Sequence, residues 1–316
     1  MTTTRLRRFA AAIILLAALV LGAAALSACG SAGDTTSAAS PSAGPITVTD
    51  DTGATVTLAA PATRIVSLAP ANTEIAYAIG AGDKMVAGTS YDDYPAEAKS
   101  LPKVGDFANP SVEKIASYQP DLVLAAAGVQ DKLRTKLEKL GMKVYVVDPR
   151  TYGGVITSIE NVGKLAGAVD GAAQVADKMT AAQADVQAAV GDAAKQTTFV
   201  EIYGKPLMTA GTDTFISDMI GIAGGDNIGD QAGSGFPNFS TEVLAKDDPA
   251  VYIADSGSMS KPGDIKTRAG FGDLTAVKDG HVYVIDDNLI ARPGPRLAEG
   301  LLKLAQMIHP EAYATP

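Results

Sequence analysis

The chain has 316 residues and a formal net charge of −9 at pH 7, with 35 acidic and 26 basic side chains. An acidic chain without a basic stripe argues against a nucleic-acid partner, and a single cysteine excludes an intrachain disulfide. The length suffices for two lobes of ordinary domain size.

The first 28 residues predict a secretory signal peptide. Three arginines precede an apolar run over residues 10–26, and small residues follow up to Cys29. The alternative is a membrane-spanning anchor, since the run approaches the length that crosses a bilayer. Leu-Ser-Ala-Cys at 26–29 resembles the bacterial lipobox, in which the cysteine is lipidated and becomes the new N-terminus. We therefore expect cleavage after residue 28 and a lipid on Cys29.

A flexible tether is expected over residues 29–45, because this stretch is rich in small and polar residues. Removal of the signal would delete three arginines and no acid, which lowers the net charge from −9 to −12. Such a charge gives the protein no electrostatic hold on an anionic membrane, so attachment would depend on the lipid.

Residues 46–153 predict an α/β lobe. Apolar and polar residues alternate over 46–58 around a Thr-Gly turn, which indicates a hairpin. Short apolar strands then alternate with helices, which is typical of a parallel sheet. The expected strands are 64–69, 84–90, 121–127 and 143–148, and the expected helices are 70–82, 111–118 and 130–141.

Residues 154–192 lack proline, are rich in alanine and repeat apolar residues at helical spacing. They predict one long helix, with a break near 170–173 left open. Residues 193–316 then resume the alternation of strands and helices. The predicted fold class is α/β, with two α/β lobes whose central sheets are mainly parallel and which a single long interlobe helix joins.

The residues of common catalytic and metal sites are scarce. The two histidines, His281 and His309, lack His-x-x-x-His spacing, so a zinc or manganese site is not expected. The chain has no Gly-x-Ser-x-Gly elbow and no phosphate- or dinucleotide-binding glycine motif. Counting residues does not exclude a Ser-His-Asp triad. We nevertheless expect no catalytic residue, no metal and no cofactor, and hence a protein that is not an enzyme.

One heptad, Phe-x-Asn-x-Ser-x-Glu, occurs twice, at 107–113 and 236–242. Its serine is a natural helix N-cap, and Glu113 and Glu242 then fall in the first helical turn, where a carboxylate suits the helix dipole. The simplest interpretation is local capping, with packing by the phenylalanine. The repetition favours a second role, because two lobes would present equivalent side chains to one cleft or rim and form a two-footed docking surface.

Five segments carry a family resemblance: RIVSLAPANTEIAYAIGAG, GTSYDDYP, VGDFANPSVEKIASYQPDLVLA, TFISDMIGIAGGDNI and ARPGPRLAEGLLKLAQMIHP. Together they resemble the substrate-binding proteins of ABC importers for vitamin B12 and, more broadly, those for ferric siderophores and haem. The resemblance covers nearly all of residues 46–310. It implies two α/β lobes joined by one long helix, with a shallow ligand cleft between the lobes that moves little on binding.

The resemblance also implies roles for individual residues. The ligand would be cobalamin or another corrinoid, bound by aromatic side chains of both lobes and one arginine: Tyr91, Phe107, Tyr203, Phe236 and Arg292. Glu113 and Glu242 would dock the protein by pairing with arginines on the two permease subunits. The implied partners are an ABC permease dimer and its cytoplasmic ATPase, reached by a monomer that a lipid anchors to the extracytoplasmic face of the membrane.

The chain departs from the B12-binding pattern in its aromatic residues, because it contains no tryptophan. Phe107 and Phe236 occupy positions where those binders place a tryptophan against the corrin, and Ala126 occupies a third. A large flat macrocycle needs aromatic walls and a few polar contacts. Loss of one wall indicates weaker binding or a ligand of another shape.

The nearest alternative is a ferric-siderophore or haem binder of the same fold. The candidate contacts are Arg150, Tyr152 and Arg292 for an anionic chelate, and Tyr91, Tyr94 or Tyr203 for haem iron. An extracytoplasmic enzyme or a sensor component is a third alternative, because a fold alone does not determine function.

Overall fold

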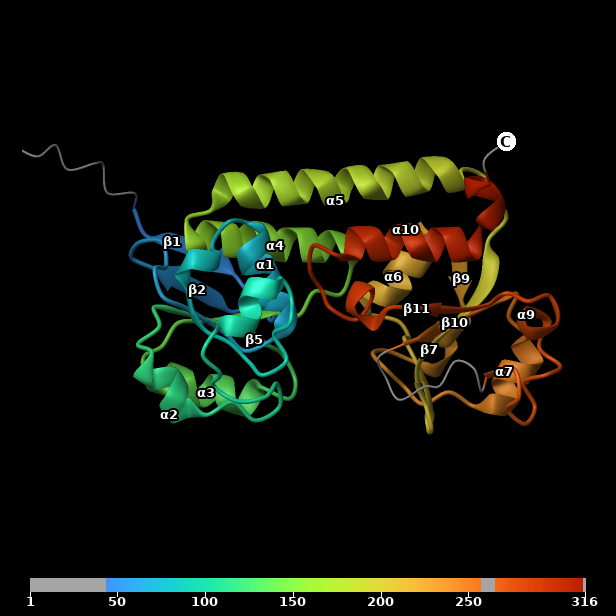
Figure 1. Cartoon of the computed structure of the whole chain (residues 1–316), viewed down its shortest axis with the longest axis horizontal. Helices are drawn as coiled ribbons and strands as arrows, with labels where there is room; N and C mark the ends of the chain where they lie inside the picture. The colour runs from blue at the N-terminus through green and yellow to red at the C-terminus, as the bar shows by residue number, and fades with distance from the viewer. Residues whose placement is uncertain (1–43, 257–264, 315–316) are drawn as a thin grey trace, which may run out of the picture. The chain divides into compact units, whose positions relative to one another are not determined.

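The structure, a computed structural model, describes residues 44–256 and 265–314. The predicted signal peptide, Cys29 and nearly all of the predicted tether therefore lie outside the described residues. Ala43–Pro316 form one compact unit, in which two α/β lobes lie beside a layer of helices (Figure 1). Within the described residues, no helix is both long and apolar enough to span a bilayer.

The N-terminal lobe contains the predicted hairpin and a parallel sheet. Strands β1 (Ile46–Thr49) and β2 (Thr55–Leu58) pair antiparallel. The sheet has the order β4-β3-β5-β6 and consists of β3 (Ile65–Ser67), β4 (Met85–Ala87), β5 (Leu122–Ala126) and β6 (Val144–Val147). Its helices are α1 (Pro70–Ala78), α2 (Val112–Ser117) and α3 (Asp131–Lys139), with short 3-10 turns η1 (Gly82–Lys84) and η2 (Ala96–Ser100). Nearly all side chains of β3, β5 and β6 are buried, as in parallel strands covered on both faces.

The C-terminal lobe is built on a second, mainly parallel sheet. Its order is β11-β10-β7-β8, with β9 also paired to β7, and only the β7–β8 pair is antiparallel. The strands are β7 (Gln196–Gly204), β8 (Leu207–Thr209), β9 (Gly225–Asn227), β10 (Val251–Asp255) and β11 (Val282–Ile285). The helices are α6 (Phe215–Ile222), α7 (Thr241–Asp247), α9 (Thr275–Lys278) and α10 (Leu297–Ile308), with η3 (Ile228–Ala232), η4 (Asp287–Leu289) and η5 (Pro310–Tyr313).

The segment predicted as one helix over 154–192 forms two helices, α4 (Tyr152–Ala166) and α5 (Val169–Val190). This corrects the predicted bounds of the interlobe helix. The fold class itself is confirmed, because α5 alone is the long helix that joins the lobes. It packs on α1 and α4, and also on α6 and α10, and Figure 1 shows it extending over both α4 and α10.

The break between α4 and α5 lies at residues 167–168, a few residues before the possible break that the sequence indicated near 170–173. Gly167 adopts a left-handed φ of 64°, and the amide of Ala168 donates to the carbonyl of Gly163 at 2.8 Å. A glycine in this conformation ends a helix and lets the chain reverse. Gly163 also permits close packing, because a Cβ there would lie 2.3 Å from the Cβ of Ala172 on α5.

The apolar core is continuous between the lobes. One cluster of buried side chains includes Ile75 on α1, Ile159 on α4, Met179 on α5, Ile220 on α6 and Leu301 on α10. Each lobe has a second cluster that packs on the other face of its own sheet. Because the helix layer shares its core with both sheets, the lobes are held together by apolar packing as well as by the chain.

Candidate functional site

Tyr91 lies on a loop that a buried aspartate fixes. Asp92 is 3% exposed, and its carboxylate accepts hydrogen bonds from the Thr73 hydroxyl (2.9 Å) and from the amide and hydroxyl of Thr89 (2.9 and 2.7 Å). Gly88 makes room for this carboxylate, since a Cβ there would lie 2.0 Å from Asp92 Oδ2. With Asp92 turned inward, Tyr91 is left 58% exposed at the surface.

Phe107 lies on a neighbouring loop that a buried glutamine holds. Gln130 is 1% exposed; its Nε2 donates to the carbonyl of Phe107 (2.9 Å), and its Oε1 accepts from the amide of Ala126 (2.9 Å). The amide of Ser90 donates to the carbonyl of Gly105 at 2.9 Å, which links this loop to the one that carries the exposed tyrosine. The structure therefore brings the two predicted contacts of the N-terminal lobe onto adjoining loops. Phe107 itself is half-buried.

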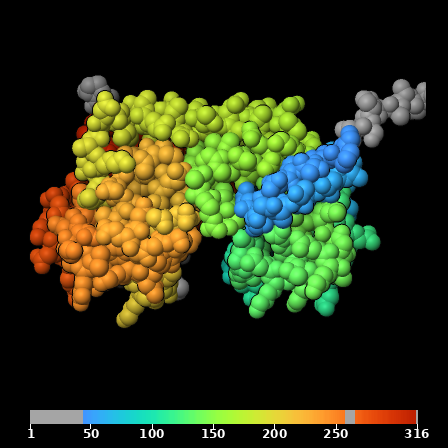
Figure 2. All heavy atoms as spheres, turned by 180° about the vertical axis from the view of Figure 1, so that it is seen from behind, coloured from blue at the N-terminus to red at the C-terminus, as the bar shows by residue number. Residues whose placement is uncertain are grey.

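The two predicted aromatic contacts of the C-terminal lobe lie on segments that flank β8. Tyr203 on β7 is paired with Met208 on β8, and Met208 forms a β-bridge with Asn238 on its other side. Phe236 precedes this bridge and is 46% exposed, whereas Tyr203 is half-buried. Figure 2 shows the surface hollowed between the two lobes, on the side away from α5.

Charged side chains of the two lobes pair with one another. Arg292 and Arg296, from the segment between β11 and α10, meet Glu74 on α1 and Asp93 of the Tyr91 loop, and we call these four residues the cross-lobe cluster. Arg292 Nη1 lies 2.9 Å from Glu74 Oε1 and 2.6 Å from Asp93 Oδ1. Arg296 binds Glu74 through two nitrogens, at 2.8 and 2.6 Å. The Glu74 side chain is 2% exposed, so the cluster encloses a buried carboxylate between two guanidinium groups.

The pKa values of the cluster follow from these contacts. Burial by itself would raise the pKa of Asp93, but the hydrogen bond and the charge of Arg292 hold it below its ordinary value. Burial would likewise lower the pKa of Arg292, and its bonds to Asp93 and Glu74 raise it instead. These contacts therefore stabilise the charged forms of Asp93 and Arg292.

Arg292 was expected to reach the ligand. The structure places it near Tyr91, because its partner Asp93 lies two residues along the same loop. Its ion pairs with Glu74 and Asp93 leave the side chain 19% exposed. Contact of Arg292 with a ligand stays a prediction.

The predicted docking acids lie on equivalent capped helices. The Ser111 hydroxyl accepts from the Lys114 amide at 3.3 Å, and the Ser240 hydroxyl accepts from the Glu242 amide at 3.2 Å. Glu113 and Glu242 are each the second residue of their helix, α2 and α7, and both are exposed. Neither forms an ion pair with another described residue. Figure 1 shows α2 and α7 on the same side of the molecule, away from α5.

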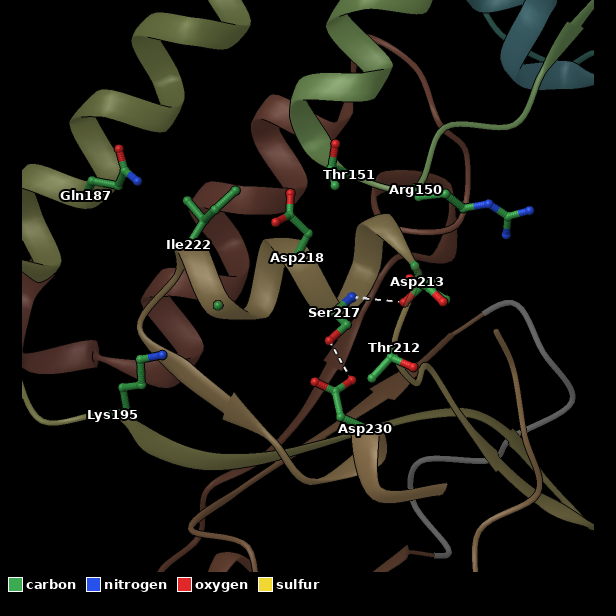
Figure 3. A pocket seen from close by; sticks show the side chains of 12 residues that line it. Arg150, Thr151, Gln187, Lys195, Thr212, Asp213, Ser217, Asp218, Ile222 and Asp230 are labelled. Carbon is green, nitrogen blue, oxygen red and sulfur yellow. Dashed lines mark hydrogen bonds between the residues drawn. The ribbon is translucent and has the colours of Figure 1, made fainter. Parts of the chain in front are cut away.

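A separate cavity of about 550 Å³ lies between α5, α6 and the residues that precede α4 (Figure 3). Its polar groups already bond one another: Asp218 Oδ2 accepts from the Tyr152 amide (2.8 Å), and the Ser217 hydroxyl donates to Asp230 (2.7 Å). In Figure 3 the side chain of Arg150 extends away from Ser217 and Asp218. The predicted aromatic contacts are not among the residues that line it: Arg150, Thr151, Gln187, Lys195, Thr212, Asp213, Thr214, Ser217, Asp218, Gly221, Ile222 and Asp230.

Of the residues predicted to contact an anionic chelate, Tyr152 is inaccessible and Arg150 is exposed. Tyr152 is fully buried, and its hydroxyl donates to the carbonyl of Met179 at 3.0 Å. Burial also raises the pKa of Tyr152 far above that of a free phenol. Arg150 is exposed, but its guanidinium pairs with Asp148 at 2.5 Å.

Both histidines have structural neighbours. His309 is buried, with Nδ1 2.9 Å from Glu311 and Nε2 3.1 Å from the carbonyl of Gly224. The ring of His281 stacks on that of Tyr283. In the described part of the chain, no group of three or more His, Cys, Asp or Glu side chains is arranged to hold a metal ion.

Four residues that position this site were not singled out from the sequence: Glu74, Asp92, Gln130 and Arg296. A weak signal existed for Asp92 and Gln130, since each is a polar residue in the segment that follows a strand of the parallel sheet, where such a sheet places its binding loops. Glu74 is a charged residue within an otherwise buried helical face. The burial of this charge is explained only by its ion pairs with Arg292 and Arg296, which are distant in the sequence.

Known proteins resemble this chain over most of its length. A family model described as periplasmic binding protein matches residues 65–289. An uncharacterized ABC transporter substrate-binding lipoprotein of Bacillus subtilis is 35% identical over 94% of this chain and 97% of its own. The crystal structure of the periplasmic vitamin B12 binding protein BtuF of Vibrio cholerae matches with a TM-score of 0.71 at 28% identity, over 81% of this chain and 99% of that one.

A possible iron-binding, periplasmic solute-binding protein of Staphylococcus epidermidis is similar to the same degree. Its crystal structure matches with a TM-score of 0.69 at 32% identity, over 78% of this chain and 99% of that one. Together these matches confirm the family resemblance that the five sequence segments predicted, and they confirm the two-lobed α/β fold class.

Proposed function

The chain belongs to the periplasmic binding protein family, and on this premise we propose that it captures cobalamin or another corrinoid outside the cytoplasm and delivers it to an ABC permease. The family consists of transport substrate-binding proteins, so the expectation that the chain is not an enzyme is confirmed. The chain is a substrate-binding protein of the ABC transporter kind. Its ligand is the part that we propose.

Exposed aromatic side chains on both lobes carry this proposal. Tyr91 on the N-terminal lobe is 58% exposed and Phe236 on the C-terminal lobe is 46% exposed, with Phe107 and Tyr203 half-buried beside them. Large apolar side chains that are exposed on a soluble protein indicate a surface for binding. Rings supplied from two lobes suit a large ligand, because a macrocycle is broad enough to offer apolar surface to each.

The cross-lobe cluster favours a ligand without excess negative charge. The two arginines of the cross-lobe cluster already face the carboxylates of Glu74 and Asp93. An anionic ferric chelate would have to compete with a buried carboxylate for these guanidinium groups, at the cost of leaving that carboxylate unpaired. A corrin ring carries mainly neutral amides, which can bond to the rim without displacing either acid.

The ferric-siderophore alternative loses support from the same observations. Of its three proposed contacts, Tyr152 is buried, Arg292 is paired with two acids and Arg150 is paired with Asp148. The haem alternative keeps Tyr91, Tyr94 and Tyr203 as possible axial ligands. The similarity to a possible iron-binding protein is the observation that favours an iron-containing ligand.

Delivery would use the two glutamates on α2 and α7. Exposed carboxylates on the same side of both lobes suit two cationic sites on a symmetric permease dimer, whose cytoplasmic ATPase would drive transport. We further propose that Cys29 carries a lipid, which holds the monomeric protein at the extracytoplasmic face of the membrane. A relative described as a lipoprotein supports this location.

The ligand can be identified from what the protein retains. Native mass spectrometry of protein purified from cells supplied with both cobalamin and haem should report a corrinoid mass on the folded chain. The absorbance of the same sample should lack a Soret band. A Soret band and a haem mass would instead support the haem alternative, and a bound ferric chelate would support the siderophore alternative.

A further inference from the structure

Tyr94 stands out among the exposed aromatic residues, because an arginine of the other lobe covers it. Its ring lies under the guanidinium of Arg296, with Cζ 4.4 Å from the ring centroid, which is within the range of a favourable cation–π contact. The same guanidinium is bound through two nitrogens to Glu74. Tyr94 is thus tied, through Arg296, to a buried carboxylate of its own lobe.

About half of Tyr94 remains in solvent despite this contact, at 49% exposure. The residue before it, Asp93, binds Arg292, and Tyr91 lies three residues back on the same loop. The loop therefore presents two exposed tyrosines at the place where the lobes meet. A half-exposed ring that is held in one orientation can meet a ligand with little loss of side-chain entropy.

We propose that Tyr94 is a further ligand-contacting residue beside Tyr91, and that Glu74 is its positioning residue. Glu74 holds Arg296 in place, and Arg296 in turn fixes the plane of the Tyr94 ring. The inference rests on the proposed binding function, and it adds an aromatic wall to a site that lacks tryptophan and has Ala126 at a third wall position.

The positioning role depends on the charge of Glu74 rather than on its volume. Its side chain is 2% exposed and meets both arginines. The substitution Glu74→Gln keeps the shape but removes the charge that holds Arg296, so the guanidinium should move toward solvent and release the ring. Glu138→Gln is the matched control, because Glu138 also pairs with an arginine, Arg134 at 2.8 Å, but within one lobe.

The absence of tryptophan makes the orientation of this ring measurable without any ligand. Tyr94→Trp introduces the only tryptophan of the chain, so its fluorescence anisotropy reports the mobility of that one side chain. We expect high anisotropy in the single variant, a clear fall when Glu74→Gln is added, and no change when Glu138→Gln is added. Low anisotropy in Tyr94→Trp itself, or none lost with Glu74→Gln, would overturn the positioning role.

Ligand contact is tested by titration with cyanocobalamin. Tyr94→Ala and Glu74→Gln should each raise Kd about tenfold, as expected for loss of one aromatic contact, whereas Tyr94→Phe should change it less than about twofold. An unchanged Kd in Tyr94→Ala would overturn the contact. If the unsubstituted protein binds haemin and not cyanocobalamin, the corrinoid proposal fails, and the same variants titrated with haemin then test Tyr94. Binding of neither probe would contradict both proposals, while the anisotropy result would still stand for Glu74.

Discussion

The two copies of the heptad have the same geometry at their glutamates and different surroundings at their phenylalanines. In both lobes a serine caps the helix and leaves the glutamate exposed at the second helical residue. Phe107 is half-buried, and its own carbonyl accepts a hydrogen bond from Gln130. Phe236, by contrast, is 46% exposed and follows Gly235, which has a φ of 73°.

This difference separates what a local pattern determines from what the surrounding fold determines. A serine cap and a first-turn carboxylate need only the four residues around them, so the same motif gives the same result in both lobes. The exposure of a phenylalanine depends on neighbours from elsewhere in the chain. We therefore expect the docking half of each heptad to be equivalent and the ligand half to be specialised.

The largest effect should come from removing both docking acids. Glu113→Ala combined with Glu242→Ala should abolish uptake of radiolabelled cobalamin by cells, and each single substitution should reduce it strongly, because a symmetric dimer needs both contacts. Cyanocobalamin affinity of the purified double variant should stay unchanged. Glu160→Ala, which removes an exposed glutamate from α4, is the control. An equal fall in affinity would show that the two acids belong to the binding site instead.

Gln130, which holds the loop of Phe107, should contribute strongly to the stability of the fold. Gln130→Ala leaves the buried Leu68 carbonyl and the half-buried Ala126 amide and Phe107 carbonyl without their partners, and an unsatisfied buried group costs about 1–3 kcal/mol. We expect the free energy of unfolding in urea to fall by about 2–4 kcal/mol. Gln174→Ala, at an exposed site on α5, should change it by less than about 0.5 kcal/mol. A similarly small change in Gln130→Ala would contradict the anchoring role.

The two phenylalanines should differ in a paired measurement of affinity and stability. Phe236→Ala should weaken cyanocobalamin binding about tenfold, the value of one aromatic contact, and leave stability within about 0.5 kcal/mol. Phe107→Ala should weaken binding and also lower stability by about 1–2 kcal/mol, since the ring is half-buried. Equal stability losses in the two variants would remove the distinction between the lobes.

The smallest expected effect is the loss, at low pH, of the stability that Asp93 contributes. The pKa of Asp93 is held below its ordinary value by Arg292, so its contribution to stability is present above that ordinary value and is lost as the pH falls through the folded-state value. Its side chain is 54% exposed, so solvent screening keeps the contribution small. The difference in unfolding free energy between the unsubstituted protein and Asp93→Asn should be constant from pH 7 to about pH 5 and shrink toward zero below about pH 4. A difference that grows in acid would contradict the assigned pairing with Arg292.

Much of the fold could be predicted because its signals are local. The buried strands are short apolar runs, and the hairpin and the two capped helices follow from turn and cap residues. The break between α4 and α5 could not be placed, because the helical spacing of apolar residues continues across it without a proline. Only the left-handed conformation of Gly167 reveals where the first helix ends.

The candidate site was less predictable because its contacts join distant parts of the chain. Glu74 and Arg296 are separated by 222 residues, and no local pattern relates them. Asp92 and Asp93 are identical neighbours in sequence, yet one turns inward to hold the loop and the other turns outward to Arg292. Which of two adjacent acids is buried depends on Gly88 and Thr73, which only the folded lobe brings to them.

Calorimetric titration of the purified protein with cyanocobalamin tests most directly whether the exposed aromatic residues of the two lobes bind a corrinoid. We expect saturable heat, one ligand bound per chain, and corrinoid absorbance that stays with the protein through gel filtration. No heat and no retained absorbance, together with binding of haemin or a ferric chelate under the same conditions, would contradict the corrinoid proposal.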